Sequence, residues 1–487
     1  MHALFRWHRR LGLIAALGVI SGTLSGVLHT SMSAFQAKPA TLDAVTRLLA
    51  NSGEQPVASV LKQNGIARIA ELNVLRWQDR LWYQVRPPQA AGRIYLDARS
   101  GKTLADGDRL YAEHLARAYL NDPASKIVSA QLVTDFSDEY PRVNRLLPVW
   151  RVAFDRPDAM RVYVDTGSGK LGSLVDRTKT FSATAFTWLH RWSWLRSPIP
   201  AARVMVLSIL LAATLAVTIV GLYLYVTRWR QASRQLGLRR VHRLGGLMLS
   251  AAALTFAASA LYHLWQGEVR GDPASRLRAP ETVIDSARIA THPLRVENGA
   301  ANPWRRISLA VVGTEPYWRF DPASQAGHRV HHHGGGPEKP APVARYHAVS
   351  NLQSLMHGDA ERARAIALAV APGAKIVATT PVTRFHGEYG FVFKRLPVQR
   401  VMLDNGRAIY VDTANGVIAA AIDGADRIEG WTFAYLHKME WLVPIMGKVG
   451  RDIVVASVSA LLLAFVVTGL IQYRRQRNSL RREQTPD

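Results

Sequence analysis

The chain contains no cysteine among its 487 residues. Without cysteine there can be no disulfide bond, no thiolate-ligated iron–sulfur cluster and no haem attached through a Cys-x-x-Cys-His motif. Any metal chemistry must therefore rest on histidine, carboxylates or methionine. Acidic residues are also scarce, at 36 against 61 lysines and arginines. This balance favours anionic ligands or lipid headgroups as partners, or is ordinary surface charge.

Charged residues are almost missing from four windows, which are Leu11–Thr30, Val204–Val226, Leu244–Leu264 and Ile453–Tyr473. Each window is long enough to cross a hydrocarbon core of about 30 Å. The sequence therefore predicts four transmembrane helices, and an even number places both ends of the chain on one side. The first window is longer than the apolar core of a cleaved signal peptide, which has roughly 7 to 15 residues.

Arginines are concentrated in the segments before the first window, between the second and third windows, and after the fourth. Basic residues near helix ends are retained in the cytoplasm, so we expect a multi-pass protein of the bacterial inner membrane with both termini cytoplasmic. The expected parts are a tail and first transmembrane helix (1–31), a periplasmic domain (32–200), a second helix (201–227), a cytoplasmic loop (228–243), a third helix (244–265), a second periplasmic domain (266–450), a fourth helix (451–473) and a tail (474–487).

The two halves of the chain resemble each other. Arg161–Gly169 and Trp188–Leu195 return as Ala408–Gly416 and Tyr435–Leu442 at a constant spacing of 247 residues. Alternating apolar residues followed by an Asp and Gly turn predict β-hairpins, and helical patterns precede them at 113–120 and 361–370. We therefore expect an internal duplication in which each half has a helix, an external α+β domain and a second helix.

Six histidines occupy the expected membrane borders in pairs that repeat between the halves: His8 with His242, His29 with His263, and His190 with His437. The expected topology places His8 and His242 at the cytoplasmic border and the other four at the outer border. Ionisable groups that face a membrane bundle are costly and are functional candidates. Neutral imidazoles from different helices suit axial ligation of a b-type haem. Symmetry pairs His8 with His242, whereas the outer four remain unassigned to pairs.

Other ligand sets are open at this point. The four outer histidines suit copper or zinc, or two of them hold haem while two contact its propionates or the substrate. A histidine tract in a glycine-rich segment is a weaker metal-ion candidate or a flexible loop; its residues are His331, His332 and His333. A stripe of Gly18, Gly22 and Gly26 on the His29 face admits a bulky group or packs helices closely.

The pattern resembles the PepSY-associated transmembrane family. The resemblance is carried by the starts of the odd-numbered spans at His8–Gly12 and His242–Gly246, by the Tyr-Val-Asp hairpins, and by Leu-His before the even-numbered spans. It implies a membrane α-helical protein with four transmembrane helices and two periplasmic α+β PepSY-like domains. Members of this family include inner-membrane proteins that reduce ferric siderophores in the periplasm, with haem held by transmembrane histidines.

The resemblance therefore implies haem-dependent transmembrane electron transfer by a b-type haem oxidoreductase. The implied cofactor is haem b, with two copies as the leading count, held by the six border histidines. The implied partners are a ferric siderophore or other ferric chelate, a cytoplasmic reductase or a quinol as electron donor, and membrane lipids, without nucleic acid. The alternative function is that of a non-enzymatic, membrane-anchored PepSY protein that binds a ligand or regulates a peptidase.

Overall fold

The computed structural model describes residues 2–41, 43–46, 48, 54–195, 200–228, 237–289, 304–322 and 343–482. The chain divides into two compact units, which we call the helical unit and the sheet unit. The helical unit comprises Met1–Gln36, Thr178–Gly271 and Arg427–Asp487. The sheet unit comprises Ala37–Arg177 and Asp272–Asp426. Each unit is thus assembled from segments that are far apart in the sequence.

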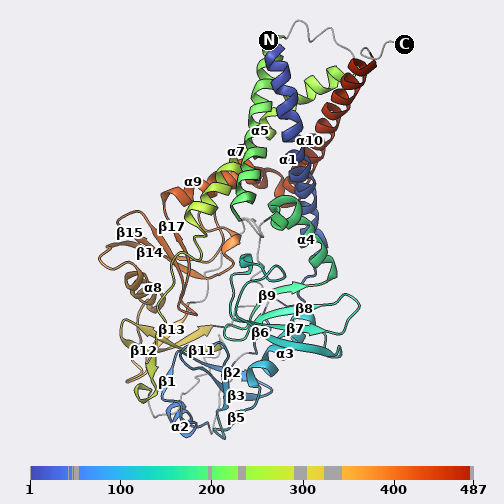
Figure 1. The fold of residues 1–487 in the computed structure, drawn as a ribbon. Helices are drawn as coiled ribbons and strands as arrows, with labels where there is room; N and C mark the ends of the chain where they lie inside the picture. The colour runs from blue at the N-terminus through green and yellow to red at the C-terminus, as the bar shows by residue number, and fades with distance from the viewer. Residues whose placement is uncertain are drawn as a thin grey trace. The chain divides into compact units, whose positions relative to one another are not determined.

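Four long helices form the helical unit (Figure 1): α1 (His2–Phe35), α5 (Pro200–Thr227), α7 (Leu238–Arg270) and α10 (Val443–Arg482). All four are long and apolar enough to span a membrane, which confirms the prediction of a membrane protein. A helix satisfies its own backbone hydrogen bonds, as a segment in lipid must. The start of α1 and the end of α10 lie at the same end of the bundle, which we call the first end; the other is the second end.

Short helices precede α5 and α10 at the second end. They are α4 (Arg177–Arg191), η2 (Ser193–Leu195), α9 (Gly424–Thr432), η5 (Phe433–His437) and η6 (Glu440–Leu442). Trp188 of α4 is 58% exposed and Trp194 of η2 is 55% exposed, and the residues 247 positions later, Tyr435 and Trp441, are exposed too. Exposed aromatic side chains next to a membrane span are typical of the lipid–water interface.

A seven-stranded sheet runs through the sheet unit in the order β13-β12-β11-β2-β3-β4-β5. Its strands are β2 (Glu71–Trp77), β3 (Arg80–Arg86), β4 (Ile94–Asp97), β5 (Thr103–Leu104), β11 (Trp304–Val312), β12 (Glu315–Pro322) and β13 (Arg345–Ala348). Strands β2 and β11 pair antiparallel, with Val74 opposite Ile307. The structure thus joins the two segments that the sequence treats as separate periplasmic domains, because this pairing closes a strand edge from each segment.

The unit also contains two four-stranded antiparallel sheets and a two-stranded sheet of β1 (Arg68–Ile69) and β10 (Ile284–Asp285). One four-stranded sheet contains β6 (Ile127–Val133), β7 (Val149–Phe154), β8 (Arg161–Asp165) and β9 (Lys170–Val175), and the other contains β14 (Ile376–Val382), β15 (Val398–Leu403), β16 (Ala408–Asp412) and β17 (Val417–Ile422). Helix α3 (Gly107–Leu120) contacts the first sheet and α8 (Gly358–Val370) the second. The predicted hairpins and helices are therefore present, and α3 and α8 begin earlier than the helical patterns do. The remaining elements are α2 (Val57–Gln63), η1 (Arg142–Asn144), η3 (Ser286–Arg288) and η4 (Phe391–Phe393).

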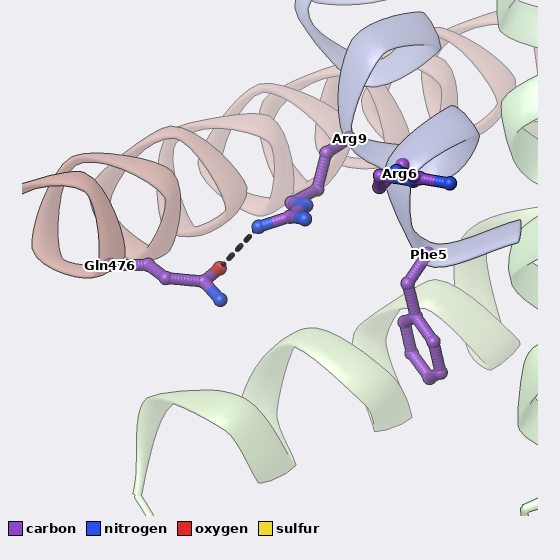
Figure 2. A pocket seen from close by; sticks show the side chains of 4 residues that line it. All are labelled: Phe5, Arg6, Arg9 and Gln476. Carbon is purple, nitrogen blue, oxygen red and sulfur yellow. Dashed lines mark hydrogen bonds between the residues drawn. The ribbon is translucent and has the colours of Figure 1, made fainter. Parts of the chain in front are cut away.

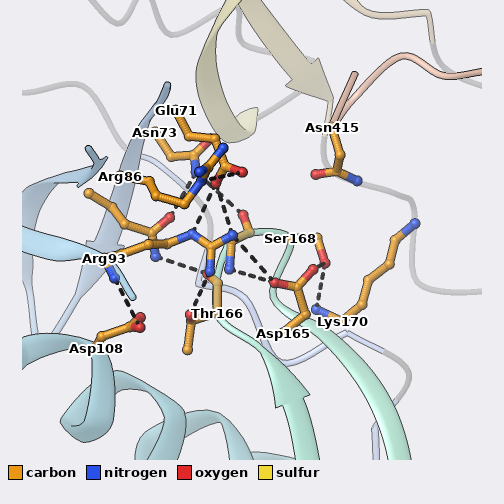
Figure 3. A network of polar contacts seen from close by, with 12 residues as sticks. Glu71, Asn73, Arg86, Arg93, Asp108, Asp165, Thr166, Ser168, Lys170 and Asn415 are labelled. Carbon is orange, nitrogen blue, oxygen red and sulfur yellow. Dashed lines mark hydrogen bonds and ion pairs between the residues drawn. The ribbon is translucent and has the colours of Figure 1, made fainter. Parts of the chain in front are cut away.

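Arg93 lies in a buried polar network of the sheet unit (Figure 3). Its guanidinium donates to Glu71 at 2.9 Å and to Thr166 at 3.3 Å, and Asp165 lies 3.8 Å away. Burial raises the pKa of the Glu71 carboxyl, but Arg93 and Arg86 more than offset this and hold that pKa below its ordinary value. The network ties the seven-stranded sheet to the turn that follows β8.

Arg93→Met is expected to lower the free energy of unfolding by about 2 kcal/mol, because it removes a buried cation from Glu71, whose side chain is 33% exposed and keeps its ion pair with Arg86 at 2.9 Å. The matched control is Arg80→Met. The Arg80 side chain is 69% exposed and its ion pair with Asp97 measures 3.5 Å, so we expect a loss of about 1 kcal/mol or less. Urea unfolding of the full chain in detergent, followed by tryptophan fluorescence, measures both. Equal shifts in the two variants would contradict the role of Arg93.

Candidate functional site

The first end of the helical unit brings His8 of α1 beside His242 of α7. Their ring centres are 6.5 Å apart and the ring planes are inclined at 71°. The two histidines that sequence symmetry pairs are thus neighbours in the structure. Both side chains are half-buried in the bundle.

A glycine of a neighbouring helix makes room for each of these rings. A Cβ atom at Gly221 of α5 would lie 3.1 Å from Cε1 of His8, and one at Gly469 of α10 would lie 3.1 Å from Cε1 of His242. Only Cε1 and Nδ1 of each ring lie within 4 Å of these positions. The Nε2 atom of each imidazole is therefore turned away from the glycine.

His242 is oriented by two residues of α10. Phe465 stacks on its ring at 4.6 Å with the planes 7° apart. The Thr468 hydroxyl donates to the Phe465 carbonyl and lies 3.4 Å from Nδ1 of His242, so its oxygen accepts a long hydrogen bond from Nδ1–H. On His8, Nδ1 is buried and has no hydrogen-bond partner among the described residues. The Nδ1–H tautomer leaves the lone pair of His242 Nε2 available for a metal.

The second end brings His190 of α4 beside His437 of η5. Their ring centres are 6.1 Å apart and their planes are inclined at 69°, which nearly repeats the geometry of the first pair. His437 ends a π-helical turn, and such turns are frequent at functional sites. The sequence left the four outer histidines unpaired, and the structure brings these two together.

A serine holds each imidazole of the second pair. Ser25 lies 2.9 Å from Nδ1 of His190, and Ser259 lies 3.2 Å from Nδ1 of His437. Each serine hydroxyl is also within hydrogen-bond distance of a backbone carbonyl of its own helix, and when it donates to that carbonyl its oxygen accepts from Nδ1–H. This arrangement favours the tautomer whose Nε2 lone pair is free.

The pKa values of both imidazoles of the second pair are lowered. Burial lowers the pKa of His190 to about 3 and that of His437 to about 4, because a charged ring loses its hydration inside the protein. Metal ligation requires the neutral imidazole. Burial therefore keeps both rings ready to bind a metal.

The remaining two border histidines contact phenylalanines rather than each other. The ring of His29 lies 5.1 Å from Phe186, and that of His263 lies 4.3 Å from Phe433. His263 also pairs with the carboxylate of Glu429. These two histidines thus flank the second pair instead of joining it.

The two pairs fit axial ligation of haem. Two imidazole nitrogens bonded to one iron at about 2 Å, with each nitrogen about 1 Å from its ring centre, place the ring centres about 6 Å apart. The observed separations are 6.5 and 6.1 Å. A bare metal ion commonly needs three or four protein ligands. Within the described ranges, no three His, Cys, Asp or Glu side chains gather closely enough to hold one.

The histidine tract lies outside the described residues, since His331, His332 and His333 fall in a gap of the description.

The three glycines of the α1 stripe do not all have the same surroundings. A Cβ at Gly18 would lie 3.0 Å from Leu210, and one at Gly26 would lie 2.9 Å from Ser459. Gly22 has no described atom within 4 Å of that position. Two of the three glycines therefore permit close helix packing, and the third faces open space.

An open basic cavity of about 530 Å³ lies at the first end (Figure 2). It is lined by Phe5, Arg6 and Arg9 of α1 and by Gln476 of α10. Arg9 donates a hydrogen bond to Gln476 at 3.1 Å. The guanidinium groups next to the His8 turn attract anionic groups to this end of the bundle.

No family model matches the chain, and no curated protein matches it either. The function must therefore be argued from the geometry of the site itself.

Several residues of this site escape sequence reasoning. Phe186 and Phe433 stand 247 positions apart, and Ser25 and Ser259 stand 234 apart, so both pairs follow the spacings of the repeat. Apolar and small residues near a span have so many packing roles that the spacing alone does not single them out. Contact with a histidine is what identifies them.

Proposed function

We propose that this protein is a b-type haem oxidoreductase of the bacterial inner membrane that transfers electrons across the bilayer to a ferric chelate in the periplasm. The proposal rests on one observation, which is that the bundle holds two imidazole pairs, one at each end, with ring centres at the separation that a shared iron requires. His8 and His242 hold one haem in this proposal, and His190 and His437 hold the other. When bound, haem supplies a one-electron couple between ferrous and ferric iron.

The surrounding residues prepare the imidazoles for this role. Ser25, Ser259 and Thr468 favour the tautomer that carries its proton on Nδ1 and leaves the Nε2 lone pair free, as partners of ligating histidines do. Gly221 and Gly469 allow the rings of the first pair to approach their neighbouring helices.

The second pair lies deeper than the outermost histidines. Its rings contact Ser25 and Ser259, which precede His29 and His263 by four residues, or about 6 Å of helix. His8 and Ser25 are 17 residues apart, which is about 26 Å along α1. Placing the outer ligands one turn inside the border shortens the path between the two ends.

The arginine-rich first end is cytoplasmic in this proposal, and the sheet unit is periplasmic and PepSY-like. A cytoplasmic reductase or a quinol gives electrons near His8 and His242, and a ferric siderophore or other ferric chelate receives them beyond the second end. The equal strand orders of the two four-stranded sheets and the matching histidine pairs support an origin by internal duplication. The exposed aromatics of α4 and η2 support contact with membrane lipids.

An absorption spectrum of the detergent-purified protein before and after dithionite tests this function. We expect the bands of low-spin b haem, and a pyridine haemochrome assay should give two haems per chain. A colourless protein, from cells supplied with ample haem, would refute the proposal. That result would favour a non-enzymatic PepSY protein that binds a ligand or regulates a peptidase.

A further inference from the structure

Six aromatic rings form a continuous ladder at the second end. From His29 the ladder passes to Phe186 at 5.1 Å and to His190 at 4.9 Å, and it then crosses to His437 at 6.1 Å. From His437 it continues to Phe433 at 5.1 Å and ends at His263 at 4.3 Å. The ladder thus connects the proposed ligands to two flanking histidines through stacked phenylalanines.

The two ends of the ladder reach the surface of the helical unit. The side chain of His263 is 51% exposed, and His29 is exposed as well. Of the pair between them, His437 is half-buried and His190 is exposed, as the ladder ends are. An acceptor that approaches either end of the ladder meets a histidine whose ring contacts are continuous with the pair.

The His263 and His29 ends of the ladder have different neighbouring residues. At one end the Glu429 carboxylate pairs with His263. The residue 247 positions earlier is Ser182, which is shorter, and it lines a cavity of about 180 Å³ between α1 and α4. Leu28 and Ser31, on either side of His29 in sequence, line the same cavity. The His263 end of the ladder therefore carries a carboxylate, whereas a cavity lies beside the turn of α1 that contains His29.

We propose that His29 is the contact through which electrons leave the protein, with one arm of a ferric chelate seated in the cavity beside it. This inference rests on the proposed function and adds the exit residue to it. A haem held by His190 and His437 would supply one electron from its ferrous state, and the chelated ferric ion would become ferrous. No bond would form or break, and His29 and Phe186 would lie on the path of the electron without being oxidised themselves.

The cavity suits part of a chelate rather than a whole one. A volume of 180 Å³ equals the space of about six liquid water molecules, which is enough for one ring or one chelating arm. The lining combines four apolar residues with five polar ones, and Lys179 is among the polar ones. Chelating arms such as hydroxamates or carboxylates carry oxygens that this cation attracts. Among the described residues that line the cavity, Lys179 is the one cation, so its removal should weaken chelate binding.

The matched pair of variants His29→Leu and His263→Leu tests the asymmetry. Both should retain the two haems and the wild-type spectrum, because neither residue is a ligand in this assignment. Stopped-flow mixing of the dithionite-reduced protein with a ferric trihydroxamate should show haem reoxidation slowed at least tenfold in His29→Leu and less than twofold in His263→Leu. His29→Phe, which keeps a ring in the ladder, should recover most of the rate.

A second readout does not depend on electron transfer. The redox-inert gallium complex of the same trihydroxamate should protect His29, but not His263, from modification by diethyl pyrocarbonate, as measured by peptide mass spectrometry. Loss of haem from His29→Leu, equal rates in the two leucine variants, or equal modification of both histidines would each overturn the assignment. Failure of the proposed function is distinct, because the wild-type protein would then contain no haem.

Discussion

His190→Ala and His437→Ala should each remove one of the two haems and abolish reduction of an external ferric chelate. Each substitution deletes one of two axial ligands at the second end, where the ring centres lie 6.1 Å apart and no third His, Cys, Asp or Glu side chain among the described residues completes a metal site. The pyridine haemochrome assay should therefore fall from two haems per chain to one. Chelate reduction should fall at least a hundredfold, because the exit side of the path is lost.

Two further variants make this result specific. His386→Ala alters a histidine of the sheet unit that belongs to neither pair, and it should keep both haems. Ser25→Ala removes the oxygen that accepts from Nδ1 of His190 but leaves the imidazole in place. Loss of such a supporting partner typically costs about 10-fold to 100-fold in affinity, so this variant should lose haem only on dilution. Two haems retained in His190→Ala would contradict the ligand assignment.

The transmembrane part of the fold is predictable from the sequence because it depends on local composition. A run such as Val204–Val226 has almost no charge, and only a helix satisfies the backbone of such a run in lipid. The hairpins are equally local, since Asp165 and Gly169 provide the turn within a few residues of the strands that it joins. The neighbours His8 and His242 follow from the symmetry of two matching helices.

The arrangement of the outer residues is not predictable in this way. His190 and His437 lie on short helices outside the membrane spans, and their contact depends on how those helices fold back on α1 and α7. The spacing of 247 residues gives equivalence between the halves but not distance. The pairing of β2 with β11 is also invisible in the sequence, because any two half-buried strands with free edges have compatible patterns.

The equivalence of Gly221 and Gly469 is hidden in the sequence, because their spacing differs by one residue from that of the repeat. Gly221 and Gly469 play the same part beside His8 and His242, but they are 248 rather than 247 residues apart. Self-comparison at the dominant spacing sets Gly221 against Thr468 and so conceals the match. The constraint becomes visible only when the distance from each glycine to an imidazole is known.

His8→Ala and His242→Ala should remove the haem of the first end and uncouple the protein from electrons supplied on the cytoplasmic side. The measurement uses proteoliposomes with dithionite trapped inside and a ferric chelate outside. The rate of chelate reduction is divided by the number of protein molecules whose first end faces the lumen. Wild-type protein should reduce the chelate, and either alanine variant should do so at least tenfold more slowly. The haem of the second end should remain, at one per chain.

Gly469→Val reaches the same site without deleting an imidazole. Its Cβ would lie 3.1 Å from Cε1 of His242, so the ring must move from its stacked position on Phe465, and we expect the same loss of one haem. Valine keeps the span apolar and helical, so insertion into the membrane should be unchanged. If Gly469→Val and His8→Ala both kept two haems and full chelate reduction, the first pair would serve only helix packing. Electrons would then have to arrive directly at the second end, which is the result expected for a quinol donor within the outer half of the bilayer.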